Sequence, residues 1–322
     1  MNVDLAIVGA GPSGLFAAYY AGFRGLRTAI VDVLPEPGGQ ITAMYPEKLI
    51  FDVAGFPSIR GRDLVTNLVE QAAPYQPHYL LGRRAQTLSY TEDGRPVLGL
   101  EDGTVLECGA VLITGGIGSF TPRPLPAAAT FTGEGVVYFV PHLDAHQGQD
   151  VIVVGGGDSA FDWALALHPV ARSVTMVHRR DKFRAHAATV AKVTELGVPI
   201  LVNAQLTRIL GDGVVRGVEV TIQGEGTRSL PADVVIAALG FVADLGPLAD
   251  WGLELRGRHI KVDSRMATNL PRVFAAGDIS DYPGKVRLIA VGFGEAATAV
   301  NNAAVVIDPS AHLFPGHSSD LS

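Results

Sequence analysis

A glycine pattern at the start of the chain restricts its fold more than any other feature. The apolar run Leu5–Val8 leads directly into Gly9-x-Gly11-x-x-Gly14, and a helix-like run, Leu15–Gly22, follows. A strand, a glycine turn and a helix in this order are typical of a dinucleotide-binding βαβ unit. In such a unit the first glycine permits the tight turn, the second lets a pyrophosphate approach the backbone, and the third lets the helix pack on the strand. Pro12 and Ser13 belong to the predicted helix N-terminus, where N–H groups attract phosphate.

Asp32 strengthens this interpretation. It ends the next apolar run, Thr28–Val31, at the spacing of about 20 residues where an acid commonly accepts a hydrogen bond from a ribose hydroxyl. The glycine pattern alone would also fit a βα turn that holds no ligand. Its place after the first strand, together with Asp32, favours a dinucleotide site.

The same pattern occurs a second time. The run Val151–Val154 leads into Gly155-Gly-Gly-Asp-Ser-Ala160, a helix-like run continues to Leu167, and a further strand is predicted at Ser173–Val177. The chain therefore contains an internal duplication of one nucleotide-binding unit. The candidate cofactor-binding residues of this second loop are Gly155, Gly157, Asp158 and Ser159.

The residues after this second unit indicate which cofactor it binds. The strand ends in His178-Arg179-Arg180, and no acid follows until Asp181. An acid at this place is typical of NAD sites, whereas a cation accommodates the 2′-phosphate of NADP. Two planar guanidinium groups suit a phosphate dianion. We therefore predict NADPH at His178, Arg179 and Arg180, with a solvated basic turn as the alternative.

The remaining segments predict further strands and helices. Helical spacing indicates a helix over Gly61–Ala73. Strand-like runs at 85–90, 97–100 and 105–108 are separated by Asp-Gly pairs, which are typical of hairpins. Near the end, Val273–Ile279 precedes a helix-like run over Gly294–Val306.

Composition excludes several classes of function. The 322 residues carry a net charge of −7, which argues against binding nucleic acid. The apolar runs are shorter than the roughly 18 residues that a membrane helix needs, and we expect a cytoplasmic protein. Cys108 is the single cysteine, so an intramolecular disulfide, a cysteine metal cluster and a Cys-x-x-Cys redox pair are excluded. The sequence predicts no metal site.

These motifs together resemble a known group of enzymes. The two glycine-rich loops and Thr268-x-x-x-x-Val273-Phe-Ala-Ala-Gly-Asp278 resemble the two-dinucleotide-fold flavoprotein reductases, and Gly38-Gly-Gln40 is similar to their thioredoxin-reductase branch. Further motifs, spread over nearly the whole chain, resemble the thioredoxin-reductase-like ferredoxin/flavodoxin–NADP⁺ reductases. They are Tyr45-Pro-Glu-Lys48, Asp52-Val-Ala-Gly-Phe-Pro57, Gly155-Gly-Gly-Asp-Ser159, His178-Arg-Arg-Asp-Lys-Phe-Arg-Ala-His186 and Phe293-Gly-Glu-Ala296.

The resemblance implies an FAD site built around the first loop. The residues that it assigns to FAD are Gly9, Gly11, Pro12, Ser13, Gly14, Asp32, Gln40, Tyr45, Ala85, Phe120, Asp278 and Ser319. Tyr45 would stack on the isoalloxazine, and His317 with Ser319 would cover its other face from the partner subunit of a homodimer. The helix-like run after Asp278 suggests a phosphate or ribityl site at a helix N-terminus, with a buried helix cap as the alternative. No acid–base dyad is expected, because hydride transfer mainly needs positioning; Tyr45 and His317 flank the flavin.

The resemblance also implies the reaction and its partner. Thioredoxin reductases pass electrons through a Cys-x-x-Cys pair, which this chain lacks. Electrons would therefore leave the flavin directly, one at a time, for ferredoxin or flavodoxin. Arg60-Gly-Arg62, Arg83-Arg84 and Lys285-Val-Arg287 are candidates for a basic rim that receives this acidic partner, and scattered solvated charges are the alternative. Reduction of a small disulfide or a quinone, and non-catalytic redox sensing, stay open as other functions.

The expected fold is therefore α/β, with two Rossmann-like domains. The FAD-binding domain would comprise residues 1–116 and 243–322. The NADPH-binding domain, residues 117–242, would be inserted within it.

Overall fold

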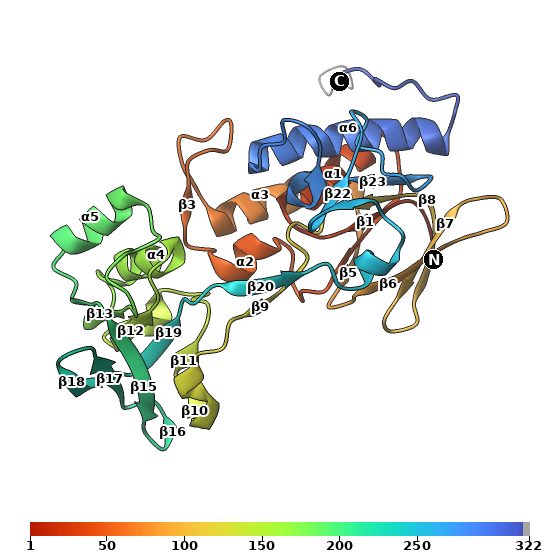
Figure 1. Cartoon of the computed structure of the whole chain (residues 1–322). Coiled ribbons are helices and arrows are strands. Elements are labelled where there is room, and N and C mark those ends of the chain that lie inside the picture. The colour runs from red at the N-terminus through yellow and green to blue at the C-terminus, as the bar shows by residue number, and fades with distance from the viewer. Residues whose placement is uncertain (318–322) are drawn as a thin grey trace. The chain divides into compact units, whose positions relative to one another are not determined.

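The computed structural model describes residues 1–317, which form two compact units (Figure 1). Unit 1 contains residues 1–120 and the residues from 243 onward, and unit 2 contains residues 121–242. The chain leaves unit 1 through β9 (Ser119–Pro122) and returns through β20 (Phe241–Asp244), and these two strands pair with each other. The first crossing thus lies slightly later than the residue 116 expected from the sequence.

Unit 1 is built on a sheet with the strand order β5-β2-β1-β8-β7-β6, and β23 also pairs with β8. The strands β5, β2, β1, β8 and β23 run parallel, and β7 and β6 continue the sheet antiparallel. These strands are β1 (Asn2–Val8), β2 (Thr28–Asp32), β5 (His78–Leu81), β6 (Ala85–Tyr90), β7 (Pro96–Leu100), β8 (Val105–Ile113) and β23 (Val273–Ala275).

The central strand β8 is longer than the sequence suggested, because Gly109 does not interrupt it. Val3 pairs with Cys108 and Leu5 with Ala110, so β1 continues alongside β8 on both sides of Gly109. A Cβ at Gly109 would lie 2.7 Å from the carbonyl oxygen of Asp4. Glycine is therefore present for close packing, and it does not end the strand.

Three helices cover one face of this sheet: α1 (Pro12–Phe23), α3 (Gly61–Ala72) and α6 (Ile289–Ile307). Alternate residues of β1 divide between the two faces: Leu5 and Ile7 pack against the helices, and Ala6 and Val8 against the other layer. That other layer includes Leu245, Leu248 and Ile260. The carboxyl ends of β1, β2 and β8 meet at one edge, where ligands bind in open α/β sheets.

Helix α6 begins at Ile289, five residues before the start expected from the sequence. Gly292 and Gly294 lower the helix propensity of its first turns. Packing decides the outcome, because a Cβ at Gly292 would lie 2.4 Å from Ser13 Oγ. By length and composition alone α6 could also cross a membrane, which is weak support for a membrane span because buried helices of soluble proteins meet the same criterion. Its buried face packs against α1 (Figure 1).

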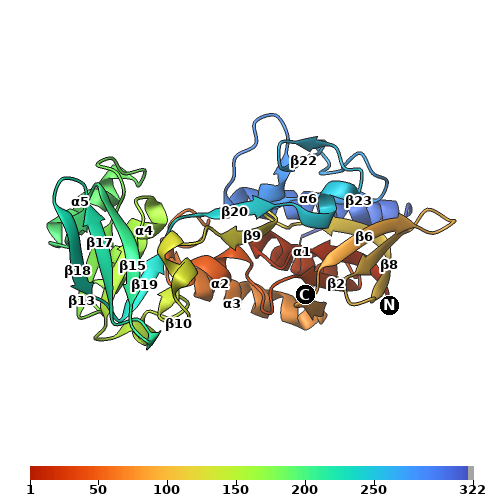
Figure 2. The same cartoon turned by 60° about the horizontal axis from the view of Figure 1, so that its bottom comes forward.

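Unit 2 has its own parallel sheet, with the order β11-β19-β12-β13-β14. Figure 2 shows a separate antiparallel sheet of β15, β17 and β18 in this unit. The elements of unit 2 are β10 (Gly133–Glu134), β11 (Val136–Val137), β12 (Asp150–Val154), α4 (Asp158–Leu167), β13 (Ser173–Val177), α5 (Ala187–Glu195), β14 (Ile200–Leu201), β15 (Ala204–Leu210), β16 (Gly213–Val214), β17 (Gly217–Ile222), β18 (Gly226–Pro231) and β19 (Val234–Ala237).

Short elements complete unit 1. They are α2 (Gln40–Met44), β3 (Leu49–Ile50), β4 (Ile59–Arg60), β21 (Leu255–Arg256), β22 (His259–Lys261), β24 (Ser280–Asp281) and the 3-10 turn Gly277–Ile279. Both units thus have the α/β architecture with a parallel sheet that the two glycine-rich loops predicted, and the chain is α/β as expected.

Candidate functional site

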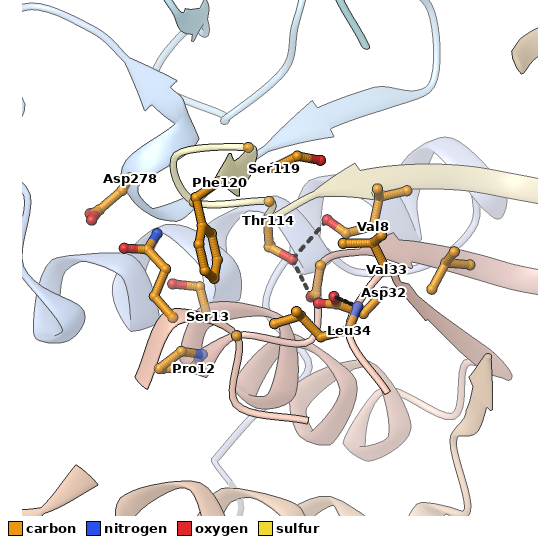
Figure 3. Close-up of a pocket in the computed structure, with 18 of the residues that line it drawn as sticks. Val8, Pro12, Ser13, Asp32, Val33, Leu34, Thr114, Ser119, Phe120 and Asp278 are labelled. Atoms are coloured by element: carbon orange, nitrogen blue, oxygen red, sulfur yellow. Dashed lines mark hydrogen bonds between the residues drawn. The ribbon is translucent and has the colours of Figure 1, made fainter. Parts of the chain in front are cut away.

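A pocket in unit 1 lies at the carboxyl ends of β1, β2 and β8. It contains about 1130 Å³ of space free of protein atoms, part of which is open to solvent. Figure 3 shows that residues of the first glycine-rich loop and residues from distant parts of the chain lie around this pocket. The residues predicted from the sequence that line this pocket are Gly9, Gly11, Pro12, Ser13, Asp32, Gln40, Tyr45, Ala85, Phe120 and Asp278.

The three glycines of the first loop have different structural roles. Gly9 has φ +116°, and a Cβ there would lie 2.6 Å from the carbonyl oxygen of Thr114. Gly14 does not line the pocket; a Cβ there would lie 1.9 Å from the carbonyl oxygen of Gly9, so helix and loop are in direct contact. At Gly11 a Cβ would meet no atom within 4 Å, and this residue lines the pocket. Gly9 and Gly14 therefore serve packing, whereas Gly11 leaves room for a ligand.

The N-terminus of α1 faces the same pocket. Gly11 is its N-cap, Pro12 occupies the first turn and needs no hydrogen-bond partner for its nitrogen, and the first turn contains no acid. Pro12 and Ser13 line the pocket (Figure 3). The helix dipole and the backbone N–H groups of the first turn therefore favour an anion here.

Asp32, at the end of β2, joins the strand to the glycine-rich loop. Its Oδ2 accepts a hydrogen bond of 2.6 Å from the Ala10 N–H, and its Oδ1 accepts one of 2.8 Å from the Leu34 N–H. Burial raises the pKa of this carboxyl, and the backbone hydrogen bonds oppose that rise. Each carboxylate oxygen keeps a second lone pair, so Asp32 can still accept from a ligand hydroxyl.

Aromatic and acidic groups lie at another part of the pocket. Burial raises the pKa of Tyr45, and the negative charges of Asp278 and Asp52 raise it further, so the Tyr45 hydroxyl is neutral near pH 7. Figure 3 shows the Phe120 ring pointing into the pocket. Burial also raises the pKa of Asp278, and the positive charges of Lys285 and Arg287 oppose the rise.

The helix expected directly after Asp278 begins eleven residues later. Asp278 lies in the 3-10 turn Gly277–Ile279, and α6 begins only at Ile289 after an intervening loop. The N-cap of α6 is Leu288, so Asp278 is not a cap of that helix. The start of α6 nevertheless returns to the pocket, because Leu288 and Ile289 line it together with Asp278.

Several lining residues were missed by reasoning from the sequence. Thr114 is buried directly after the end of β8, and its Oγ1 donates a hydrogen bond of 2.8 Å to the carbonyl oxygen of Gly9 (Figure 3). Its position between the apolar run 110–113 and Gly115 was the available signal. Val33, Leu34 and Ser119 had no such signal.

Other predicted residues lie elsewhere. His317 does not line the pocket of its own chain; it is exposed, and its ring centroid lies 5.1 Å from that of Phe314. Ser319 lies outside the described residues. The expectation that Lys285 contributes to a basic rim was wrong: its side chain is 2% exposed and pairs with Glu295. Arg62 pairs with Glu47 on the surface.

The second loop, in unit 2, also ends in a glycine N-cap, but the helix that follows has an acid in its first turn. Gly157 is the N-cap of α4, and Asp158 in its first turn accepts a hydrogen bond of 2.8 Å from the His186 N–H. A Cβ at Gly156 would lie 2.3 Å from the ring of His178, so this ring packs directly on the loop. Gly155 is buried and Ser159 is exposed at the start of α4.

Exposed cations follow the adjacent strand β13. Arg179 and Arg180 come directly after His178 and are both exposed. The backbone N–H of Arg184 donates a hydrogen bond of 2.7 Å to the carbonyl oxygen of Gly156, which brings this further exposed arginine to the loop. The sequence motif contained Arg184, but its proximity to the loop follows only from the fold.

The structure also bears on cysteine redox chemistry and on metal binding. Cys108 is fully buried, and burial raises the pKa of its thiol to about 12. Within residues 1–317, no group of three His, Cys, Asp or Glu side chains is arranged to hold a metal ion.

Comparison with known proteins agrees with this architecture. Residues 3–303 match the family described as pyridine nucleotide-disulphide oxidoreductase. A ferredoxin–NADP reductase of Salinispora tropica is 72% identical over 99% of this chain and 99% of its own length. One from Saccharopolyspora erythraea is 64% identical over 99% of this chain and 98% of its own. The crystal structure of T. acidophilum thioredoxin reductase is similar with a TM-score of 0.76 and 29% identity, covering 96% of this chain and 99% of that one. The chain thus belongs to the pyridine nucleotide-disulphide oxidoreductase family and, within it, to the ferredoxin–NADP reductases.

Proposed function

We propose that this protein is an FAD-dependent oxidoreductase that transfers electrons between NADPH and ferredoxin, with flavodoxin as a second acceptor. The observation that carries the proposal is the pocket of unit 1, which joins the first glycine-rich loop to Tyr45 and Asp278. Full-length relatives named ferredoxin–NADP reductase support the acceptor. We place the reaction in the cytoplasm, where NADPH is available.

The residues of the pocket fit the adenosine and pyrophosphate parts of FAD. Gly11 leaves open space beside the N-terminus of α1, and a pyrophosphate there would meet backbone N–H groups and no acid. Asp32 would accept a hydrogen bond from the ribose on its remaining lone pairs. Ala85 would contact the adenine through its backbone. Gly14 would act indirectly, by allowing α1 to pack on the loop.

The other end of the pocket fits the flavin. Tyr45 would stack on the ring, Gln40 and Phe120 would lie beside it, and Asp278 would bind ribityl hydroxyls. When bound, the flavin accepts a hydride from NADPH at N5 and delivers single electrons to the acceptor. The chain's own contribution is to orient the ring and exclude water, because hydride transfer needs little acid–base help.

Unit 2 is proposed to bind NADPH. The N-terminus of α4 and the loop Gly155-Gly-Gly157 would hold its pyrophosphate, with Asp158 and Ser159 at the first turn. Arg179 and Arg180 would bind the 2′-phosphate, and His178 would shape the loop beside it. Unit 1 would then be the FAD-binding domain and unit 2 the NADPH-binding domain.

The route by which electrons leave follows from the cysteine content. A disulfide reductase of this fold passes electrons through a pair of thiols, and this chain has one cysteine, which is buried. Electrons must therefore pass from the flavin straight to the acceptor. We further propose a homodimer in which His317 and Ser319 of one subunit cover the flavin of the other.

An anaerobic titration tests this function. NADPH should bleach the visible absorbance of the bound flavin, and addition of oxidised ferredoxin should restore it. A flavin that NADPH leaves oxidised would indicate a non-catalytic sensor. Reoxidation by quinones or small disulfides, with no response to ferredoxin or flavodoxin, would contradict the proposed acceptor.

A further inference from the structure

Lys285 and Glu295 form an ion pair in the interior of unit 1. Their side chains are only 2% and 4% exposed. Burying two charges costs free energy that their attraction offsets only with good geometry, and an apolar pair of similar size is often as stable. By contrast, the Lys261–Glu254 pair of the same unit lies on the surface, with side chains 48% and 62% exposed. The buried pair therefore calls for a role other than stability.

Each member of the pair forms a hydrogen bond with the backbone of Gly277. Oε2 of Glu295 accepts a bond of 2.8 Å from the Gly277 N–H. Nζ of Lys285 donates one of 3.0 Å to the Gly277 carbonyl oxygen, and the Ser280 hydroxyl donates another of 2.8 Å to the same oxygen. Both backbone polar groups of Gly277 are thus fixed by this cluster.

Tyr282 also binds the Glu295 carboxylate. Its hydroxyl donates a hydrogen bond of 2.7 Å to Oε1 of Glu295. Burial and this hydrogen bond raise the pKa of Tyr282 to about 12, so the hydroxyl remains a donor at physiological pH. Glu295 therefore receives a tyrosine O–H, a backbone N–H and the Lys285 ammonium, which satisfies its buried oxygens.

Gly277 in turn determines the position of Asp278. Its φ of +77° starts the 3-10 turn, and a Cβ there would lie 2.8 Å from Ser13 Oγ, so the turn packs tightly on the first loop. Asp278 is the next residue and lines the pocket (Figure 3). A shift of Gly277 would move the Asp278 carboxylate directly.

We propose that the Lys285–Glu295 ion pair positions Asp278 for FAD by locking the turn at Gly277, an inference that rests on the proposed function. Lys285 and Glu295 are positioning residues, because they act on the cofactor through the turn. The lysine charge also favours the ionised carboxylate of Asp278.

The test measures FAD binding to apoprotein by the quenching of FAD fluorescence. The double variant Lys285→Met/Glu295→Leu should bind FAD at least about tenfold more weakly, which corresponds to the loss of one charge-assisted hydrogen bond between Asp278 and the cofactor. Chemical denaturation of the apoprotein verifies that the variant is folded. The matched surface variant Lys261→Met/Glu254→Leu should change FAD affinity by less than about twofold. The combined variant Lys285→Met/Glu295→Leu/Asp278→Asn should bind FAD no more weakly than the weaker-binding of its two parents, the buried double variant and Asp278→Asn.

Ser280→Ala offers a milder second variant should the double variant fail to fold. It removes one hydrogen bond to Gly277, and it should weaken FAD binding about threefold, but only when Asp278 is present. Normal FAD affinity in these variants, or losses that multiply with that of Asp278→Asn, would overturn the inference. Wild-type apoprotein that takes up no FAD would instead overturn the proposed function itself.

Discussion

Single side chains at the pocket already determine much of its geometry without a ligand. Asp32 joins β2 to the first loop through the Ala10 and Leu34 N–H groups, and Thr114 joins β8 to the same loop through the Gly9 carbonyl. These bonds preorganise the loop, which lowers the cost of binding. Cys108 lies within β8, which ends one residue before Thr114, and packs in the hydrophobic core with no such role.

The state of Cys108 gives a prediction at the level of one residue. A pKa of about 12 leaves only about one thiol in ten thousand ionised at pH 8. The native protein should therefore resist iodoacetamide, whereas protein unfolded in guanidinium should react with one equivalent. Because the pKa lies above its value in an unfolded chain, the protonated thiol favours the folded state, and that contribution is lost only as the pH rises through about 9 to 12.

Cys108→Ala provides the functional counterpart. It should keep ferredoxin reduction per bound FAD within about twofold while it costs about 1 kcal/mol of unfolding free energy. An alanine variant that retains flavin reduction by NADPH and loses reduction of ferredoxin would show that the thiol takes part in electron transfer.

At the level of elements, the strand–loop–helix unit β1–α1 combines close packing and open pocket space in one glycine pattern. Gly14 permits α1 to contact the loop, and Gly11 leaves space at the N-terminus of α1. The sequence motif assigns the two glycines different roles, Gly11 beside the pyrophosphate and Gly14 in helix packing. Their surroundings differ, so their substitution should have different effects.

Replacing each glycine by alanine separates the two roles. In Gly11→Ala the added methyl group contacts no protein atom, so apoprotein stability should change little. The FAD affinity should fall by at least about tenfold, because the methyl group occupies the place of the pyrophosphate. Gly14→Ala meets the Gly9 carbonyl and should lower the unfolding free energy by about 3 kcal/mol. Chemical denaturation of apoprotein and fluorescence titration with FAD measure the two quantities.

The second loop supplies a matched control for this pair. Gly157 is the N-cap of α4, and its Cβ position is also free of neighbours. Gly157→Ala should therefore leave FAD affinity unchanged. A loss of apoprotein stability in Gly11→Ala as large as that in Gly14→Ala would contradict the assignment of separate roles.

At the level of the whole molecule, each unit carries one glycine-rich loop on its own parallel sheet. If the units hold different cofactors, a change in unit 2 should alter the use of NADPH and leave the FAD content of unit 1 intact. Only the full chain can show this division, because turnover requires both cofactors.

The double variant Arg179→Ala/Arg180→Ala tests that division. Loss of two guanidinium contacts to a phosphate should raise the KM for NADPH by about 10- to 100-fold. The KM for NADH and the FAD content should stay unchanged, since NADH lacks the 2′-phosphate. Steady-state flavin reduction with both nucleotides measures this. Arg208→Ala, at an exposed arginine of β15, controls for the loss of positive charge alone. Equal losses with NADH and NADPH would overturn the assignment to the 2′-phosphate.

The sequence by itself determined the elements that depend on local patterns. Both βαβ units, the helix α3 and the hairpin strands β6 and β7 follow from apolar spacing, glycine turns and Asp-Gly pairs, which act over a few residues. The absence of a dithiol relay follows from counting cysteines. Motif order was sufficient for the family, which the comparisons confirm.

Tertiary structure decided what depends on contacts between distant segments. The first turns of α6 contain two glycines and are helical because they pack on Ser13. Lys285 looked like a surface cation until the fold buried it against Glu295, ten residues further along the chain. Gly14 also lies close to Thr114, 100 residues further along the chain, because a Cβ at Gly14 would lie 2.7 Å from Thr114 Oγ1. Local propensity carries no information on such contacts, because their energy arises only when the chain has brought the segments together.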